Sequence, residues 1–142
     1  MSRPGRLALI GGLALSIGLA GIAAAWALGP ARLPVNETIG IHYSGFDRSS
    51  IRIPAGVPVT VVLRNDDPID HEWIVGDAAT QARHRTGSEA AHGDRPSEVI
   101  IPAGATRTTT ITFATPGTYL FICHLPGHEA YGMIGRVIVT RG

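Results

Sequence analysis

Apolar and polar positions alternate in short runs from residue 38 onward, and Gly, Pro, Asn and Asp separate the runs. A period of two predicts half-buried β-strands, and the many β-branched and aromatic residues in these runs favour strands as well. The predicted strands lie in TIGIHYSGF (38–46), SIRIPAG (50–56), VPVTVVLRNDD (57–67), HEWIVGD (71–77), SEVIIPAG (97–104), ATRTTTITFATPG (105–117), TYLFICH (118–124) and RVIVT (136–140). Seven or eight such strands with almost no helical periodicity predict an all-β antiparallel sandwich or small barrel.

One segment departs from this alternation. Residues Ala78 to Pro96 are polar and poor in strand formers, so we expect a long surface excursion with one helical turn around Ala78 to His84. Its two histidines, His84 and His92, are expected to be solvated loop residues. The alternative is a second, weaker metal site or a partner contact.

The beginning of the chain has another pattern. Residues Leu7 to Leu28 form 22 consecutive uncharged residues, preceded by Arg3 and Arg6. A secretory signal has an apolar stretch of roughly 7 to 15 residues and a membrane-spanning helix needs about 20, so the length favours a retained anchor. The alternative is a signal cleaved near Ala23 to Ala25. With the arginines on the cytoplasmic side, the rest of the chain is expected outside the cytoplasm, in the periplasm or at the cell surface.

Length and charge limit the choice of function. The 142 residues allow one ordinary domain plus an appendage, which we divide into a signal-anchor (1–29), a linker (30–36) and a β-domain (37–142). Beyond residue 32, nine arginines accompany eleven acidic residues. This mildly acidic balance argues against a nucleic-acid partner.

The only cysteine, Cys123, lies in FICHLPGHEAYGMIG (121–135). A lone cysteine cannot close an internal disulfide in an oxidising compartment, so Cys123 is a buried apolar residue, a reactive thiol or a metal ligand. His128 and Met133 follow at intervals of five residues, a spacing that neither a helix nor a strand can bring to one point. Pro126 and Gly127 break the strand after Cys123, and the resulting loop can bring the three side chains together.

A fourth group has to come from another part of the chain. His71 is the best candidate, because it stands at the head of a predicted strand and a sandwich gathers its loops at one end. Two imidazoles, one thiolate and one thioether match the His₂Cys set with a weak axial Met that is typical of electron-transfer copper. Structural zinc sites prefer more thiolates, and iron–sulfur clusters need more cysteines than this chain has.

The order His71, Cys123, His128, Met133, with the spacing C-x₄-H-x₄-M late in an exported β-domain, resembles the cupredoxin family and its plastocyanin/azurin-like branch. The resemblance covers roughly residues 37 to 142. It implies a Greek-key sandwich in which these four residues hold one type 1 copper. The chain departs from many members at Glu72, where they have Asn or a small polar residue, so the main-chain N–H of Glu72 is left to reach the cysteine sulfur.

The site has no open coordination position and no evident substrate base, so we expect an electron carrier without a small-molecule substrate, rather than an enzyme. Transient redox partners are expected to dock at an apolar surface around His128. Copper storage or delivery is the nearest alternative. Less favoured are a copper oxidoreductase in which His124 serves a second centre in an oligomer, and a thiol enzyme with Cys123 as nucleophile. We expect a structural or exposed role for His124 and an ordinary strand position for His42.

Overall fold

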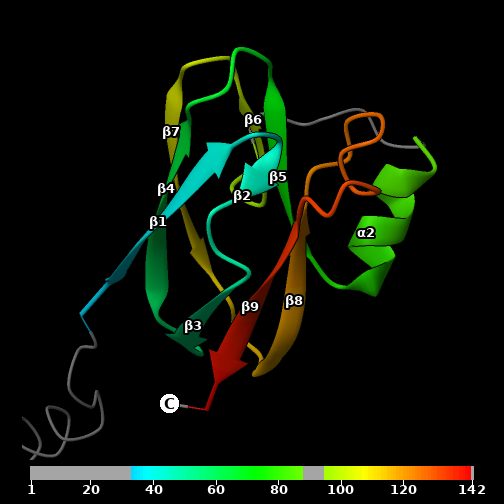
Figure 1. Ribbon diagram of the computed structural model, residues 1–142. Coiled ribbons are helices and arrows are strands. Elements are labelled where there is room, and N and C mark those ends of the chain that lie inside the picture. The colour runs from blue at the N-terminus through cyan, green and yellow to red at the C-terminus, as the bar shows by residue number, and fades with distance from the viewer. Residues whose placement is uncertain (1–32, 88–94, 142) are drawn as a thin grey trace, which may run out of the picture. The chain divides into compact units, whose positions relative to one another are not determined.

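Two β-sheets form the structure, a computed structural model that describes residues 33–87 and 95–141 (Figure 1). In spatial order, the first sheet contains β2 (Gly45–Phe46), β1 (Val35–His42), β4 (Pro58–Asn65) and β7 (Thr106–Thr112). The second contains β3 (Ser50–Pro54), β9 (Ile134–Thr140), β8 (Gly117–Ile122), β5 (His71–Gly76) and β6 (Glu98–Ile101). The all-β prediction is confirmed. The described strands number nine rather than seven or eight, because the run 38–46 forms both β1 and β2.

The sheets are not purely antiparallel, which corrects the sequence-based expectation. β1 pairs with β4 in parallel, and β3 pairs with β9 in parallel, whereas the other strand pairs are antiparallel. The cause is the path of the chain, which leaves the first sheet after β2, forms β3 in the second sheet and returns to the first as β4. Strands joined by such a crossover can run in the same direction, whereas strands joined by a tight hairpin cannot.

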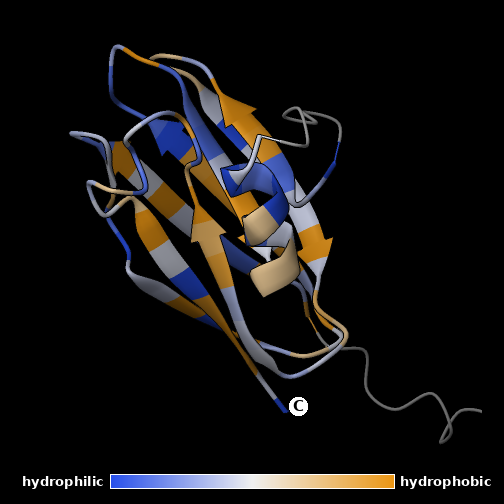
Figure 2. Cartoon of the chain, turned by 90° about the vertical axis from the view of Figure 1, so that its right-hand side faces the viewer, coloured by the Kyte–Doolittle hydropathy of each residue, from blue (hydrophilic) through white to orange (hydrophobic). Residues whose placement is uncertain are grey.

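The core lies between the two sheets. Buried and more exposed positions alternate along β4, as the period of two predicts, and Figure 2 shows the matching bands of apolar and polar residues along the strands. Trp73 and Phe121 are fully buried in this core, as expected of core aromatics. The core cluster also contains buried aliphatic residues from both sheets, among them Ile39, Ile41, Ile51, Ile53, Val59, Val61, Leu63, Val137 and Val139.

Helix α2 (Ala78–Arg85) is longer than the single turn expected from the sequence, and it packs beside β5 and β8 (Figure 1). The buried side chain of Gln81 attaches it, because its Nε2 donates to the carbonyls of Ile74 (3.1 Å) and Leu120 (2.9 Å). His84 is buried as well, so the expectation of a solvated His84 was wrong. His92 lies outside the described residues.

The described strands belong to one compact unit, Leu33–Gly142. The proposed signal-anchor (1–29) and most of the linker lie outside the described residues. Within residues 33–87 and 95–141, no helix has the length and apolar character needed to cross a membrane.

Loops gather at one end of the two sheets. The connection between β4 and β5 crosses the upper end in Figure 1, and the orange connection between β8 and β9 lies at the same end, whereas β9 finishes at the lower end. Asn65 at the end of β4 fixes the first of these loops, since its Nδ2 donates to the carbonyls of Ile69, Ile101 and Pro102 at 2.8–3.1 Å. This end carries the predicted ligands.

Candidate metal centre

Three of the four predicted ligands converge at the loop end. His71 is the first residue of β5, Cys123 directly follows β8, and His128 lies in the loop before β9. One ligand atom from each lies within 4.8 Å of the other two. The Nδ1 atom of His128 is 3.2 Å from both the Nδ1 atom of His71 and the Sγ atom of Cys123. Residues separated by more than fifty positions therefore share one site.

Met133, the fourth predicted ligand, is fully buried and bound through its main chain to two of the others. Its N–H donates to the carbonyl of His128 (3.0 Å), and its carbonyl accepts from the N–H of Cys123 (3.2 Å). The loop between them turns at Gly127 and Gly132, whose φ angles of 86° and 92° favour glycine. Main-chain hydrogen bonds thus fix the spacing between Cys123, His128 and Met133.

The thiol of Cys123 is buried and receives a hydrogen bond from the main-chain N–H of Glu72, 3.3 Å from the sulfur. The sequence-based expectation for this N–H is confirmed. Burial raises the pKa of the Cys123 thiol, although the main-chain N–H groups of Glu72 and Leu125 lower it in part. A buried thiol with a raised pKa is unlike the reactive cysteines of thiol enzymes. A metal ion that binds this sulfur has to displace the proton.

The side chain of Glu72 is half-buried. Burial raises the pKa of the Glu72 carboxyl, and a main-chain hydrogen bond from His124 opposes that rise. Glu72 links the two ligand segments through its main-chain N–H, which donates to the sulfur of Cys123.

The two imidazoles differ in exposure, because His71 is fully buried and His128 is half-buried. Burial lowers the pKa of His128, the neighbouring His71 lowers it further, and Asp67 raises it in part. His128 is therefore neutral at neutral pH, which is the state that binds metals. The Nε2 atom of His71 lies 2.9 Å from a carboxylate oxygen of Asp67. The sequence analysis did not single out Asp67. The one hint in the sequence was a carboxylate four residues before the candidate ligand His71.

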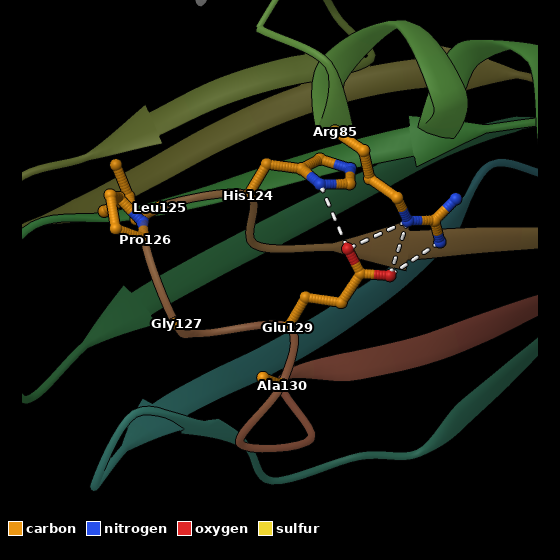
Figure 3. A pocket seen from close by; sticks show the side chains of 7 residues that line it. All are labelled: Arg85, His124, Leu125, Pro126, Gly127, Glu129 and Ala130. Carbon is orange, nitrogen blue, oxygen red and sulfur yellow. Dashed lines mark hydrogen bonds and ion pairs between the residues drawn. The ribbon is translucent and has the colours of Figure 1, made fainter.

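His124 lies beside the site and is fixed within its own chain. Its Nε2 is 2.7 Å from Oε1 of Gln81, and its Nδ1 is 3.5 Å from Oε2 of Glu129, which also pairs with Arg85 (Figure 3). Only 5% of the side chain is exposed. These contacts support the structural role expected of His124. His42 ends β1 with its side chain 56% exposed.

The donor set and its spacing suit copper. A metal ion lies about 2 Å from an imidazole nitrogen, and two nitrogens 3.2 Å apart are close enough to share one ion. Two imidazoles with one buried thiolate form the type 1 combination. Residues 35–140 match the family model described as copper binding proteins of the plastocyanin/azurin family.

This chain belongs to that family.

As a cupredoxin, it binds copper, and His71, Cys123 and His128 form a group like a type 1 site. Among curated relatives, the copper-resistant cuproprotein CopI of Rubrivivax gelatinosus is 34% identical over 98 residues, which cover 66% of this chain and 59% of that protein. The cupredoxin thus spans less than two thirds of that CopI. Auracyanin-A of Chloroflexus aurantiacus is 32% identical over 109 residues, which cover 67% of each chain.

Solved structures agree with the sequence comparison. The structure of auracyanin A from Chloroflexus aurantiacus, described as a blue copper protein, has a TM-score of 0.61 and 27% identity and covers 76% of this chain and all of that one. Auracyanin B has the same TM-score with 26% identity, over 78% of this chain and 93% of that one. A multicopper oxidase shares the fold, with a TM-score of 0.59 and 20% identity over 77% of this chain and 39% of its own.

Proposed function

We propose that this cupredoxin is a one-electron carrier whose copper ligands are His71, Cys123, His128 and Met133. The convergence of the His71, Cys123 and His128 ligand atoms within 4.8 Å carries the proposal. The hydrogen bonds of the Met133 main chain to both loop ligands support the fourth assignment. Copper, when bound, supplies exchange of one electron between Cu(II) and Cu(I).

The protein's contribution is to keep the ligands in place while the electron moves. His71 and Cys123 adjoin paired strands, and the sulfur keeps its hydrogen bond from Glu72 N–H. A donor at the thiolate withdraws electron density from the sulfur and thereby tunes the potential. Because three of the four ligands are buried and main-chain hydrogen bonds hold the loop that carries His128, little rearrangement should accompany electron transfer.

Electrons would enter and leave at His128, the half-buried ligand. Its loop presents apolar groups to solvent, including the exposed Pro126, Ala130 and Tyr131, the last with 81% of its surface exposed. A small apolar surface above a buried metal favours brief contacts with redox partners.

The chain has three proposed segments. We propose residues 1–29 as a signal-anchor, 30–36 as a linker and 37–142 as the copper domain, held outside the cytoplasm at the membrane. The uncharged stretch of 22 residues after two arginines supports this arrangement.

Copper storage or delivery is the second candidate, and the likeness to a protein named copper-resistant cuproprotein favours it. The two functions differ in whether the metal leaves. The test mixes the full chain loaded with Cu(I) with a metal-free copper-binding partner and, separately, with an oxidised redox protein. A carrier keeps its copper and exchanges electrons, whereas a delivery protein loses its copper.

Cys123→Ser is the matched variant for the ligand assignment. Serine preserves the size of the side chain but removes the thiolate, so we expect the intense visible absorption of the oxidised protein to disappear. Retention of that absorption in the variant would refute Cys123 as a ligand.

A further inference from the structure

The carboxylate of Asp67 is buried behind the copper site, on the side of His71 away from the other ligands. Asp67 is 6% exposed. One of its oxygens lies 2.9 Å from Nε2 of His71, while Nδ1 of His71 is the atom that faces His128. The Nε2 atom of His71 therefore faces the carboxylate, and its Nδ1 atom faces the proposed metal site.

The two-residue hairpin turn between β1 and β2 fixes this carboxylate. Tyr43 and Ser44, between β1 and β2, have φ angles of 53° and 54°, a conformation that non-glycine residues rarely adopt. Their two successive N–H groups each donate to a different oxygen of Asp67, both at 2.7 Å. Successive N–H groups in such a turn form a concave site for an anion. A positive φ at both central residues fits a two-residue hairpin between β1 and β2.

The main chain of Asp67 is held as firmly as its side chain. Its N–H donates to Oδ1 of Asn65 (2.9 Å), and its carbonyl accepts from the N–H of Gly104 (3.0 Å). Asn65 is itself buried and bound to three carbonyls. The carboxylate therefore has little freedom to leave His71.

An ionised carboxylate only accepts hydrogen bonds, so Nε2 of His71 has to carry the proton. In a neutral imidazole the other nitrogen then keeps its lone pair. That nitrogen is Nδ1, which lies 3.2 Å from Nδ1 of His128. A negative charge behind a ligating imidazole also raises the basicity of that ligand and favours the more highly charged metal ion.

We propose that Asp67 is a positioning residue of the copper site, which holds His71 in the tautomer that presents Nδ1 to the metal and stabilises Cu(II) relative to Cu(I). This inference rests on the proposed function for its redox part. The hydrogen bond between Asp67 and His71 does not depend on copper.

The test compares Asp67→Asn with Asp66→Asn in the copper-loaded full chain. Both variants remove one negative charge from the same loop, but Asp66 is exposed and pairs with Arg64 at 3.0 Å. We expect Asp67→Asn to lower the affinity for Cu(II) relative to Cu(I) about tenfold, which raises the potential of a one-electron couple by about 59 mV. Asp66→Asn should shift the reduction potential far less. Equal shifts in the two variants would overturn the redox part of the proposal.

A second measurement uses the wild-type protein without copper, so it does not depend on whether a variant folds. Nitrogen-15 NMR of the metal-free wild-type chain should show His71 with a protonated Nε2 and an unprotonated Nδ1. A proton on Nδ1 would overturn the positioning role, whatever the variants do. Failure of the wild-type chain to undergo reversible redox chemistry would instead reject the carrier function and leave the NMR result valid.

Discussion

A substitution of Met133 can distinguish the contribution of its sulfur as a ligand from the contribution of its side chain to packing. The main chain of Met133 holds Cys123 and His128 in place, and its side chain is fully buried. Met133→Leu preserves the volume and the main-chain hydrogen bonds but removes the thioether. We expect the variant to keep its intense colour and to show a higher reduction potential, because a weak donor to the oxidised ion is lost.

Visible spectra and redox titration of Met133→Leu check this expectation. Ile134→Leu, at the next and partly exposed position, is the control and should leave the potential unchanged. A wild-type potential in Met133→Leu would show that the thioether does not contribute to the site.

The ring of Phe121 on the neighbouring strand leaves no room for a side chain at Gly135. Gly135 pairs with Phe121 across β8 and β9, and a Cβ atom at position 135 would lie 2.0 Å from the nearest atom of the Phe121 ring. Phe121 is fully buried and packs edge-on against Phe46, so it has little room to move. Gly135→Ala should therefore lower the free energy of unfolding by about 1–3 kcal/mol, the usual cost of overpacking.

Urea denaturation of the metal-free protein measures this effect. Gly45→Ala is the matched control, because the nearest atom to its added Cβ is at an ordinary 3.5 Å. Equal stability of the two variants would contradict the proposed clash.

At the scale of residues, the candidate ligands could be predicted because their chemical types and loop positions point to one metal. Asp67 could not be predicted. The loop between β4 and β5 contains Asp66, Asp67 and Asp70, and only the fold determines which carboxylate faces His71. Likewise, the residue types of Tyr43 and Ser44 do not predict a positive φ, since glycine is the usual residue at such positions.

At the scale of elements, the strands followed the alternation of apolar and polar residues, and each predicted run overlaps a strand. Helix α2 was underestimated. It has no strong apolar face, so the periodicity that reveals most surface helices is absent. The buried polar residue Gln81 helps to attach it through hydrogen bonds to β5 and β8.

Gln81→Leu tests this attachment. Leucine is apolar and of similar size, but it leaves the carbonyls of Ile74 and Leu120 and the ring of His124 without their bonds to Gln81. A buried polar group that loses its partner costs about 1–3 kcal/mol, so we expect a loss of stability in that range. Ala82→Gln, at an exposed position on the same helix, is the control for urea denaturation. A stability unchanged from wild type in Gln81→Leu would show that α2 is held by other contacts.

At the scale of the whole molecule, local pattern indicated a β-sandwich but not its pairing. The alternation along β1 and β3 is the same whether the partner strand is parallel or antiparallel, so the two parallel pairs followed from the path of the chain and not from sequence signals. What the fold adds is a common end for loops that are distant in sequence. That end unites His71 with the segment from Cys123 to Met133.

The most direct test of electron transfer at this end is a redox titration of the copper-loaded full chain, followed by visible absorption and paramagnetic resonance. We predict a single bound copper with an intense visible band that bleaches and returns in one reversible one-electron step. A colourless Cu(II) complex of the correctly folded protein would contradict the proposed site and its function.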